Sequence, residues 1–210
     1  MASSSIQRAR NVILDLEKRY GDIAWWPGTP EEVMIGAVLT QQTRWENVEN
    51  ALVNLKERNI CSLEGIAASA DEDIEAAIRC TGFFRIKTRR LKALASRVQE
   101  GGGLSVLGEM KTGRLRSFLL DINGVGPETA DSILCYCFLR ASFVIDAYTH
   151  RICACAGIRE RGNELKSLFE SALPPDNDAH RLCHAWFVEY AKEMCARRRC
   201  EECRIRNLNE

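Results

Sequence analysis

The chain has 210 residues and a mass of 23.7 kDa, and 46% of its residues are hydrophobic and 28% charged, which is typical of a folded globular protein and excludes a disordered or collagen-like one. Its 29 basic and 29 acidic side chains give a formal net charge of zero, so the sequence does not predict that the whole surface attracts nucleic acid. No uncharged apolar run is long enough for a transmembrane helix, and the first residues lack the apolar segment of a secretory signal, so we expect a cytoplasmic protein with no membrane partner.

Apolar residues recur at helical spacing through most of the sequence. A first helix is expected over 6–20, and Thr29 followed by Pro30 predicts the start of a second, strongly apolar helix. Further helices are predicted over 44–58, 72–80, 87–99, 113–121, 127–139, 147–156, 163–172 and 178–195. Only 141–145 has a β-like pattern, and it is too short to build a sheet. We therefore predict an all-α protein of about ten helices, with no linker and no internal repeat.

Basic side chains gather in two segments of the sequence. Residues 85–92 carry five positive charges, and residues 197–206 hold a second group. Such runs are typical of solvated helix faces, and they are equally typical of local surfaces that contact nucleic acid.

The segment 118–130 predicts a helix, a tight turn and a new helix. Gly124 and Gly126 allow positive φ and the close approach of another backbone, and Pro127 suits the first position of the second helix. The N–H groups at such a helix start can bind a phosphate, although a plain helical hairpin would have the same pattern.

Asp146 directly follows the β-like segment and precedes the predicted helix 147–156. It suits the cap of that helix, because Asp is a favoured N-cap residue. A capping carboxylate beside a buried segment can also be partly desolvated, which is an environment in which carboxylates become functional groups. Asp146 is therefore a candidate for both roles.

Cysteine is frequent, with ten residues, and disulfides are not expected in a cytoplasmic protein. Three of these residues, Cys195, Cys200 and Cys203, are flanked by charged residues and spaced C-x4-C-x2-C, which is typical of metal ligands. The cysteines with apolar neighbours are interpreted as small core residues, and they are Cys61, Cys80, Cys135, Cys137, Cys153 and Cys155.

The sequence I-N-G-V-G-P-E-T-A at 122–130, with Asp146 placed 18 residues after Glu128, resembles the helix-hairpin-helix glycosylases of the endonuclease III superfamily. The stretch G-F-F-R-I-K at 82–87 also resembles that superfamily. W-W-P at 25–27, L-T-Q-Q-T at 39–43 and D-A-Y-T at 146–149 are most similar to its 3-methyladenine DNA glycosylase branch.

The resemblance implies one glycosylase unit over 1–210, with two helical lobes and an active-site cleft between them. Lobe one is expected over about 23–140 with the hairpin at 113–139, and lobe two over about 1–22 plus 141–210 with a Cys-rich segment at 195–203. Asp146 then corresponds to the catalytic aspartate of the family. The hairpin residues that would hold DNA phosphates are Asn123, Gly124, Val125, Gly126 and Thr129.

The chain departs from the family pattern at three places. Glu128 stands where bifunctional members have the lysine that forms a Schiff base, so AP lyase activity by that route is not expected. Asn123 stands where the family usually has proline, so the turn is expected to be less rigid. Endonuclease III relatives bind a 4Fe–4S cluster through four cysteines spaced C-x6-C-x2-C-x5-C, whereas no cysteine follows Cys203 here.

A cluster held only by cysteines needs four thiolates. Cys183 lies about three helical turns before Cys195 and could contribute only if the helix breaks. The sequence therefore favours a degenerate remnant or an adventitious metal site over a bound cluster, and catalysis is expected to need no cofactor.

Further roles follow from what such an enzyme must do. Trp25, Trp26 and Trp45 are candidates for the walls of a base pocket, and the alternative is that they are core aromatics. Glu128 is a candidate for a second carboxylate in the pocket, and the alternative is a charge that stabilises the dipole of its own helix. Gln41 or Gln42 is a candidate for filling the gap left by an extruded base or for a polar helix end. Phosphate contacts are expected from Arg85, Lys87, Arg89 and Arg90.

We therefore expect a monomeric base-excision-repair glycosylase, associated with the nucleoid, that removes a damaged base from double-stranded DNA. The base is expected to be an alkylated purine such as 3-methyladenine. One alternative is an endonuclease III-like glycosylase and AP lyase with a 4Fe–4S cluster. Another is a DNA-binding hairpin protein without catalysis, against which the position of Asp146 argues.

Overall fold

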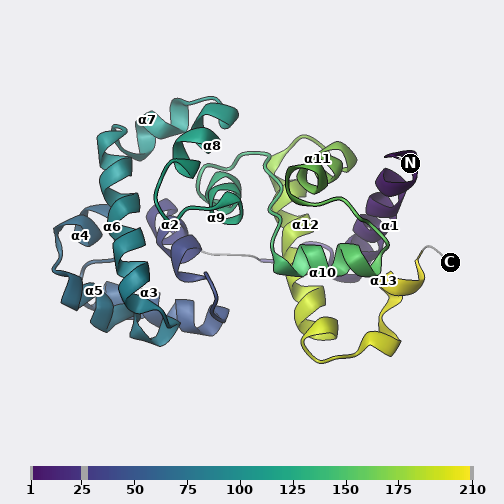
Figure 1. The fold of residues 1–210 in the computed structure, drawn as a ribbon, viewed down its shortest axis with the longest axis horizontal. Coiled ribbons are helices and arrows are strands. Elements are labelled where there is room, and N and C mark those ends of the chain that lie inside the picture. Colours follow the sequence, from purple (N-terminus) through teal and green to yellow (C-terminus); the bar gives the residue numbers. More distant parts are fainter. Residues whose placement is uncertain (1, 25–27, 209–210) are drawn as a thin grey trace. The chain divides into compact units, whose positions relative to one another are not determined.

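The computed structural model describes residues 2–24 and 28–208. Every regular element in these ranges is a helix, so the predicted all-α fold is confirmed (Figure 1). The chain divides into two compact units. Unit 1 comprises Met1–Pro27 and Leu139–Glu210, and unit 2 comprises Gly28–Phe138. None of the described helices is long and apolar enough to span a membrane.

Unit 2 is built around α2 (Pro30–Leu39), which is buried from Val33 to Leu39. The hydroxyl of Thr29 accepts a hydrogen bond from the N–H of Glu32 at 3.3 Å and caps this helix, as expected from the sequence. Helices α3, α6 and α9 pack against α2. The other elements of the unit are α3 (Trp45–Glu57), α4 (Leu63–Ala68), α5 (Asp71–Ile78), η1 (Arg79–Thr81), α6 (Phe84–Glu100), α7 (Gly103–Glu109), α8 (Thr112–Leu120), α9 (Pro127–Ser132) and η2 (Ile133–Cys137).

Two short helices of unit 2, α4 and α7, are not predicted from the sequence. They have six and seven residues, so each offers too few turns for a periodic pattern. The predicted helix 127–139 is interrupted, because α9 continues into the π-turn η2, in which the N–H of Phe138 bonds the carbonyl of Ile133 at 3.1 Å.

Unit 1 joins the two ends of the chain. The N-terminal α1 packs against α11 and α12, which come from the last third of the sequence (Figure 1). Phe143, Phe169 and Phe187 form the centre of the core, with the rings of Phe143 and Phe169 stacked at 4.7 Å. The elements are α1 (Ala2–Tyr20), α10 (Ala147–Cys155), α11 (Gly162–Ala172), α12 (Asn177–Tyr190), η3 (Ala191–Cys195), η4 (Cys200–Glu202) and α13 (Arg204–Asn207).

The β-like segment 141–145 lies in unit 1 and belongs to no regular element in the described residues. Side chains of α11 bind the backbone of Phe143 in this segment. The N–H of Phe143 donates to Glu170 Oε1 at 3.2 Å, and Lys166 Nζ donates to the carbonyl of Phe143 at 2.9 Å. The segment is therefore fixed in the core directly before Asp146.

Candidate active site and DNA interface

Asp146 is the N-cap of α10, as predicted. Its Oδ1 atom accepts two hydrogen bonds from Thr149, one from the backbone N–H and one from the hydroxyl, both at 2.7 Å. Its Oδ2 atom lies 3.6 Å from Nε2 of His184 on α12. Only 9% of Asp146 is exposed. The carboxylate is thus held at one oxygen and directed toward an imidazole at the other.

The pKa of Asp146 lies below its ordinary value of 3.8. Burial acts to raise the pKa, because it disfavours the charged form. The neighbouring His184 and the two hydrogen bonds from Thr149 act in the opposite direction and outweigh burial. Asp146 is therefore a buried carboxylate that is ionised at neutral pH, which is the state needed to stabilise a positive charge.

In unit 2, the hairpin turn lies between α8 and α9. Gly124 has a φ of 88°, and a Cβ atom there would overlap the side chain of Arg90, so both the backbone and the packing require glycine. Gly126 differs from the expectation, because its φ of −88° is open to any residue and no atom lies near its Cβ position. In the described part of the chain, no backbone carbonyl accepts from the N–H of Gly124 or Gly126. These groups suit an incoming phosphate.

Gln41 holds the hairpin turn. Its Nε2 atom donates to the carbonyl of Gly124 at 2.9 Å and to the hydroxyl of Thr129 at 3.1 Å, and its Oε1 atom accepts from Arg90. Thr129 is 6% exposed, and Val125 is also buried, so these two residues anchor the turn by their side chains. The side chains of Gln41, Val125 and Thr129 are therefore engaged within the protein, which limits the DNA contacts predicted for them. Asn123, by contrast, is exposed.

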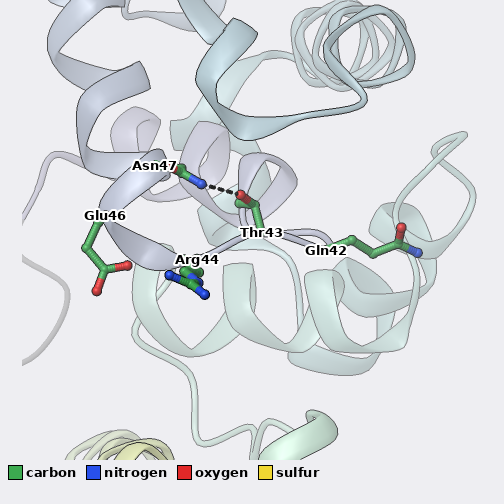
Figure 2. A pocket seen from close by; sticks show the side chains of 5 residues that line it. All are labelled: Gln42, Thr43, Arg44, Glu46 and Asn47. Atoms are coloured by element: carbon green, nitrogen blue, oxygen red, sulfur yellow. Dashed lines mark hydrogen bonds between the residues drawn. The ribbon is translucent and has the colours of Figure 1, made fainter. Parts of the chain in front are cut away.

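Gln42 differs from its neighbour Gln41 in being exposed, with a φ of 55° that side chains rarely adopt. It lines an open depression of about 650 Å³ together with Thr43, Arg44, Glu46 and Asn47. Figure 2 shows its side chain pointing away from the hydrogen bond between Asn47 and Thr43, which measures 3.1 Å. Of the two glutamines, Gln42 is thus the one available to contact DNA.

The prediction of a phosphate contact by Lys87 is wrong. Lys87 is 1% exposed, and its Nζ donates to the carbonyls of Leu39 and Thr81, both at 2.8 Å. Burial and, to a smaller extent, the charge of Arg90 together lower the pKa of Lys87 to about 8. Arg85 is exposed, and its ion pair with Glu75 is long at 3.8 Å, so its charge stays accessible to solvent.

The remaining described candidates for the base pocket both lie in unit 2. Trp45 is half-buried at the start of α3, and Glu128 is exposed in the first turn of α9. Trp25 and Trp26 lie outside the described residues. The cleft between the lobes, with Asp146 facing these side chains, stays a prediction.

The cysteines of the C-terminal segment gather in unit 1 around a cavity of about 280 Å³. Cys195, Cys200 and Cys203 line it, as their spacing suggests, and so does Cys155, which is exposed and not the core residue that the sequence predicts. Cys183 is fully buried elsewhere in the core. In the described residues, no three or more His, Cys, Asp or Glu side chains come together closely enough to hold a metal ion.

Sequence reasoning missed two features of the site. His184 belongs to α12, far from Asp146 in the sequence, and no local pattern marks it. Lys87 could have been recognised as buried, because it lies four and seven residues before the buried Leu91 and Leu94 on one helix face.

Comparison with known proteins identifies the family. The model of the HhH-GPD superfamily of base excision DNA repair proteins matches residues 35–175, which is two thirds of the chain. The chain belongs to this superfamily. A putative DNA repair glycosylase of Methanocaldococcus jannaschii is 39% identical over 213 aligned positions, which cover 97% of this chain and 94% of the relative. This HhH-GPD protein is therefore a DNA repair glycosylase.

Solved structures of HhH-GPD enzymes have the same fold. The crystal structure of the H. pylori 3-methyladenine DNA glycosylase bound to 1,N6-ethenoadenine superposes with a TM-score of 0.77 at 28% identity and covers 90% of this chain and 97% of that chain. A non-covalent endonuclease III–DNA complex superposes with a TM-score of 0.81 at 20% identity, over 97% of this chain and 94% of that chain. The second likeness shows the fold alone.

Proposed function

We propose that this glycosylase is monofunctional and hydrolyses the N-glycosidic bond of an alkylated purine, such as 3-methyladenine, in double-stranded DNA. The observation that carries the proposal is the buried, ionised carboxylate of Asp146, held by Thr149 and paired with His184. In this reaction the bond between the sugar C1′ and the base nitrogen breaks, and the bonding electrons leave with the base. Water then adds its hydroxyl to C1′ and loses a proton.

The base must first leave the helical stack, because its glycosidic bond is not accessible inside a duplex. The N–H groups of Gly124 and Gly126 are suited to hold a phosphate of the distorted strand. The exposed Gln42 is suited to occupy the space that the extruded base leaves. Arg85 and Arg89, exposed at the start of α6, are suited to contact further phosphates.

Asp146 acts when positive charge develops on the sugar as the base departs. A fixed negative charge in a buried site stabilises such a transition state more than water does, because it needs no reorganisation. A carboxylate oxygen can also accept a hydrogen bond from the attacking water and so orient it. Thr149 fixes Oδ1 through two hydrogen bonds, so Oδ2, the oxygen near His184, is the one that remains for either task.

Glu128 argues for hydrolysis without strand cleavage. Bifunctional relatives use an amine at this position to form a Schiff base with C1′, and a carboxylate has no nitrogen with which to do so. Glu128 lies in the first turn of α9, where the positive end of the helix dipole stabilises its negative charge. We therefore assign it a supporting role.

The choice of an alkylated purine is supported by tryptophans and by one relative. A purine methylated at N3 is a cation, and an indole face attracts a cation by about 0.5–2 kcal/mol. Trp45, with Trp25 and Trp26 in the preceding segment, would supply such faces. The structure of the 28% identical 3-methyladenine glycosylase contains a modified adenine, 1,N6-ethenoadenine.

The test is to incubate the enzyme with methylated duplex DNA and identify the released base by chromatography. Parallel reactions use duplexes that carry one ethenoadenine, uracil, hypoxanthine or oxidised guanine. Release of 3-methyladenine as the preferred product is expected. Release of a deaminated or oxidised base alone would reject the substrate class but not the glycosylase, whereas no release of any base would favour the DNA-binding alternative.

The absence of lyase chemistry is tested on the same products. The strand is expected to stay intact until alkali is added, and borohydride is expected to trap no covalent complex. An endonuclease III-like enzyme serves as the positive control for both readouts. Nicking without alkali that Asp146→Asn abolishes would contradict the monofunctional assignment.

A further inference from the structure

Four cysteines from separate parts of unit 1 surround one cavity of about 280 Å³. Cys155 is the last residue of α10 and Cys195 is the last residue of η3. Cys200 begins η4, and Cys203 directly precedes α13. Helix α10 packs against α12 and α13, and η3 packs against η4, so these contacts bring the four side chains to one place.

We propose that Cys155 is the fourth ligand of a 4Fe–4S cluster, with Cys195, Cys200 and Cys203 as the other three. The family pattern takes all four ligands from the C-terminal segment, and this chain lacks the last of them. Here the missing thiolate comes from α10, 40 residues before Cys195. The set of four thiolates is then complete, as a cluster held only by cysteines requires.

The side chains fit a cluster better than a single ion. Zinc binds cysteine at about 2.3 Å, so four tetrahedral thiolates around one ion lie only about 4 Å apart. In the described part of the chain, no three His, Cys, Asp or Glu side chains are placed to hold a single ion. A cluster has an inorganic body of its own and holds its thiolates farther apart, around a space such as this cavity.

The other cysteines of unit 1 do not reach the cavity. Cys153 lies two residues before Cys155 on α10, so it faces the opposite side of the helix, and it is 0% exposed in the core. Cys183 is also 0% exposed, in the middle of α12. Cys155 is therefore the cysteine that joins the three at the C-terminus.

Charge and packing around the cavity support the assignment. Arg199 and Arg206 line the cavity, and their guanidinium groups favour the net negative charge of a four-thiolate cluster. The hydroxyl of Tyr190 lies 3.3 Å from Sγ of Cys203, and hydrogen bonds to ligand sulfurs are a common feature of such sites. The cluster would hold α10, η3 and the C-terminal segment together.

The test measures iron and acid-labile sulfide in the full chain, purified without oxygen and reconstituted with iron and sulfide. About four of each per chain are expected, with visible charge-transfer absorption and an electron paramagnetic resonance signal after reduction. Cys155→Ala is expected to lose at least half of the iron, and the same loss is expected of Cys200→Ala. Cys80→Ala, at an exposed cysteine of unit 2, is the matched control and is expected to bind iron normally.

Three results would overturn the proposal. They are full iron content in Cys155→Ala, no iron in the reconstituted wild type, and uptake of one zinc ion per chain in place of a cluster. Cys155→Ser separates ligation from folding, because its oxygen can still bind iron. A folded Cys155→Ser protein with a shifted resonance spectrum is expected, and an unchanged spectrum would argue against ligation. None of these readouts depends on which base the enzyme removes.

Discussion

The Oδ2 atom of Asp146 lies 3.6 Å from Nε2 of His184, so the carboxylate that begins α10 is paired with an imidazole of α12. The pair is buried, and both residues belong to unit 1. The neighbouring imidazole helps to keep the carboxylate charged where burial alone would favour its neutral form. Substitutions at these two residues can separate the chemistry of Asp146 from its role as a helix cap.

Asp146→Asn keeps the shape and the capping ability of the side chain but removes its charge. We expect kcat to fall by about 10²–10⁴-fold, because the lost interaction stabilises the transition state, while duplex binding changes little. Asp176→Asn is the matched control, since Asp176 caps α12 through the N–H of Ala179 in the same way. Single-turnover base release should be normal in that variant. Equal loss of activity in both variants would contradict a catalytic role.

His184→Leu removes the imidazole whose interaction lowers the pKa of Asp146. Burial is then opposed only by the two hydrogen bonds from Thr149, so the pKa of Asp146 rises. Asp146 acts in its ionised form. In the plot of kcat/KM against pH, the loss of activity on the acid side should therefore begin at a higher pH. The stability that ionised Asp146 contributes should also be lost at higher pH than in the wild type as the pH falls. His180→Leu, four residues earlier on α12 and bonded to Pro174, should leave the acid side of the plot unchanged.

The two glycines of the hairpin turn are expected to respond differently to alanine. Gly124→Ala forces a φ of 88° on a residue with a Cβ and displaces Arg90, so the free energy of unfolding should fall by more than about 1 kcal/mol. Gly126→Ala meets no strain and no neighbour, so stability should change by less than about 0.5 kcal/mol. Its methyl group should instead obstruct a phosphate and weaken duplex binding. Unchanged affinity of Gly126→Ala would argue against a phosphate at this turn.

The buried Lys87 makes the free energy of unfolding depend on pH. Its pKa is about 8 in the folded chain and 10.5 ordinarily, so between these values the unfolded chain binds more protons and stability rises with pH. Across this range the free energy of unfolding should rise by about 3 kcal/mol. Lys87→Met should be destabilised, because the carbonyls of Leu39 and Thr81 lose their donor. The difference between wild type and variant in urea unfolding should grow from pH 7 to pH 10.

Much of the architecture follows from periodicity and capping. Thr29 with Pro30, and Asp146 before its helix, were sufficient to locate two helix starts, because the capping bonds are local. The π-turns η2 and η3 could not be predicted, since each adds a residue to a turn without changing the apolar pattern of the sequence.

The parts of the site that escaped prediction depend on long-range packing. His184 meets Asp146 only after α10 and α12 pack together, and Cys155 reaches the C-terminal cysteines by contacts of the same helix. Gln41 and Gln42 are identical in type and adjacent, yet the first bonds to Gly124 and the second is exposed. Their difference comes from the hairpin, which lies about 80 residues away in the sequence.

The assembly of unit 1 from both chain ends affects the order of events during synthesis. Helix α1 is made first, but α11 and α12 follow only after about 140 further residues, which a ribosome adds in about 7–30 s. Unit 2 is contiguous, so all its partners emerge earlier and it can fold first. During that interval the apolar face of α1, with Val12 and Leu16, has no core to join. This face is therefore the part of the nascent chain most suited to binding by a chaperone.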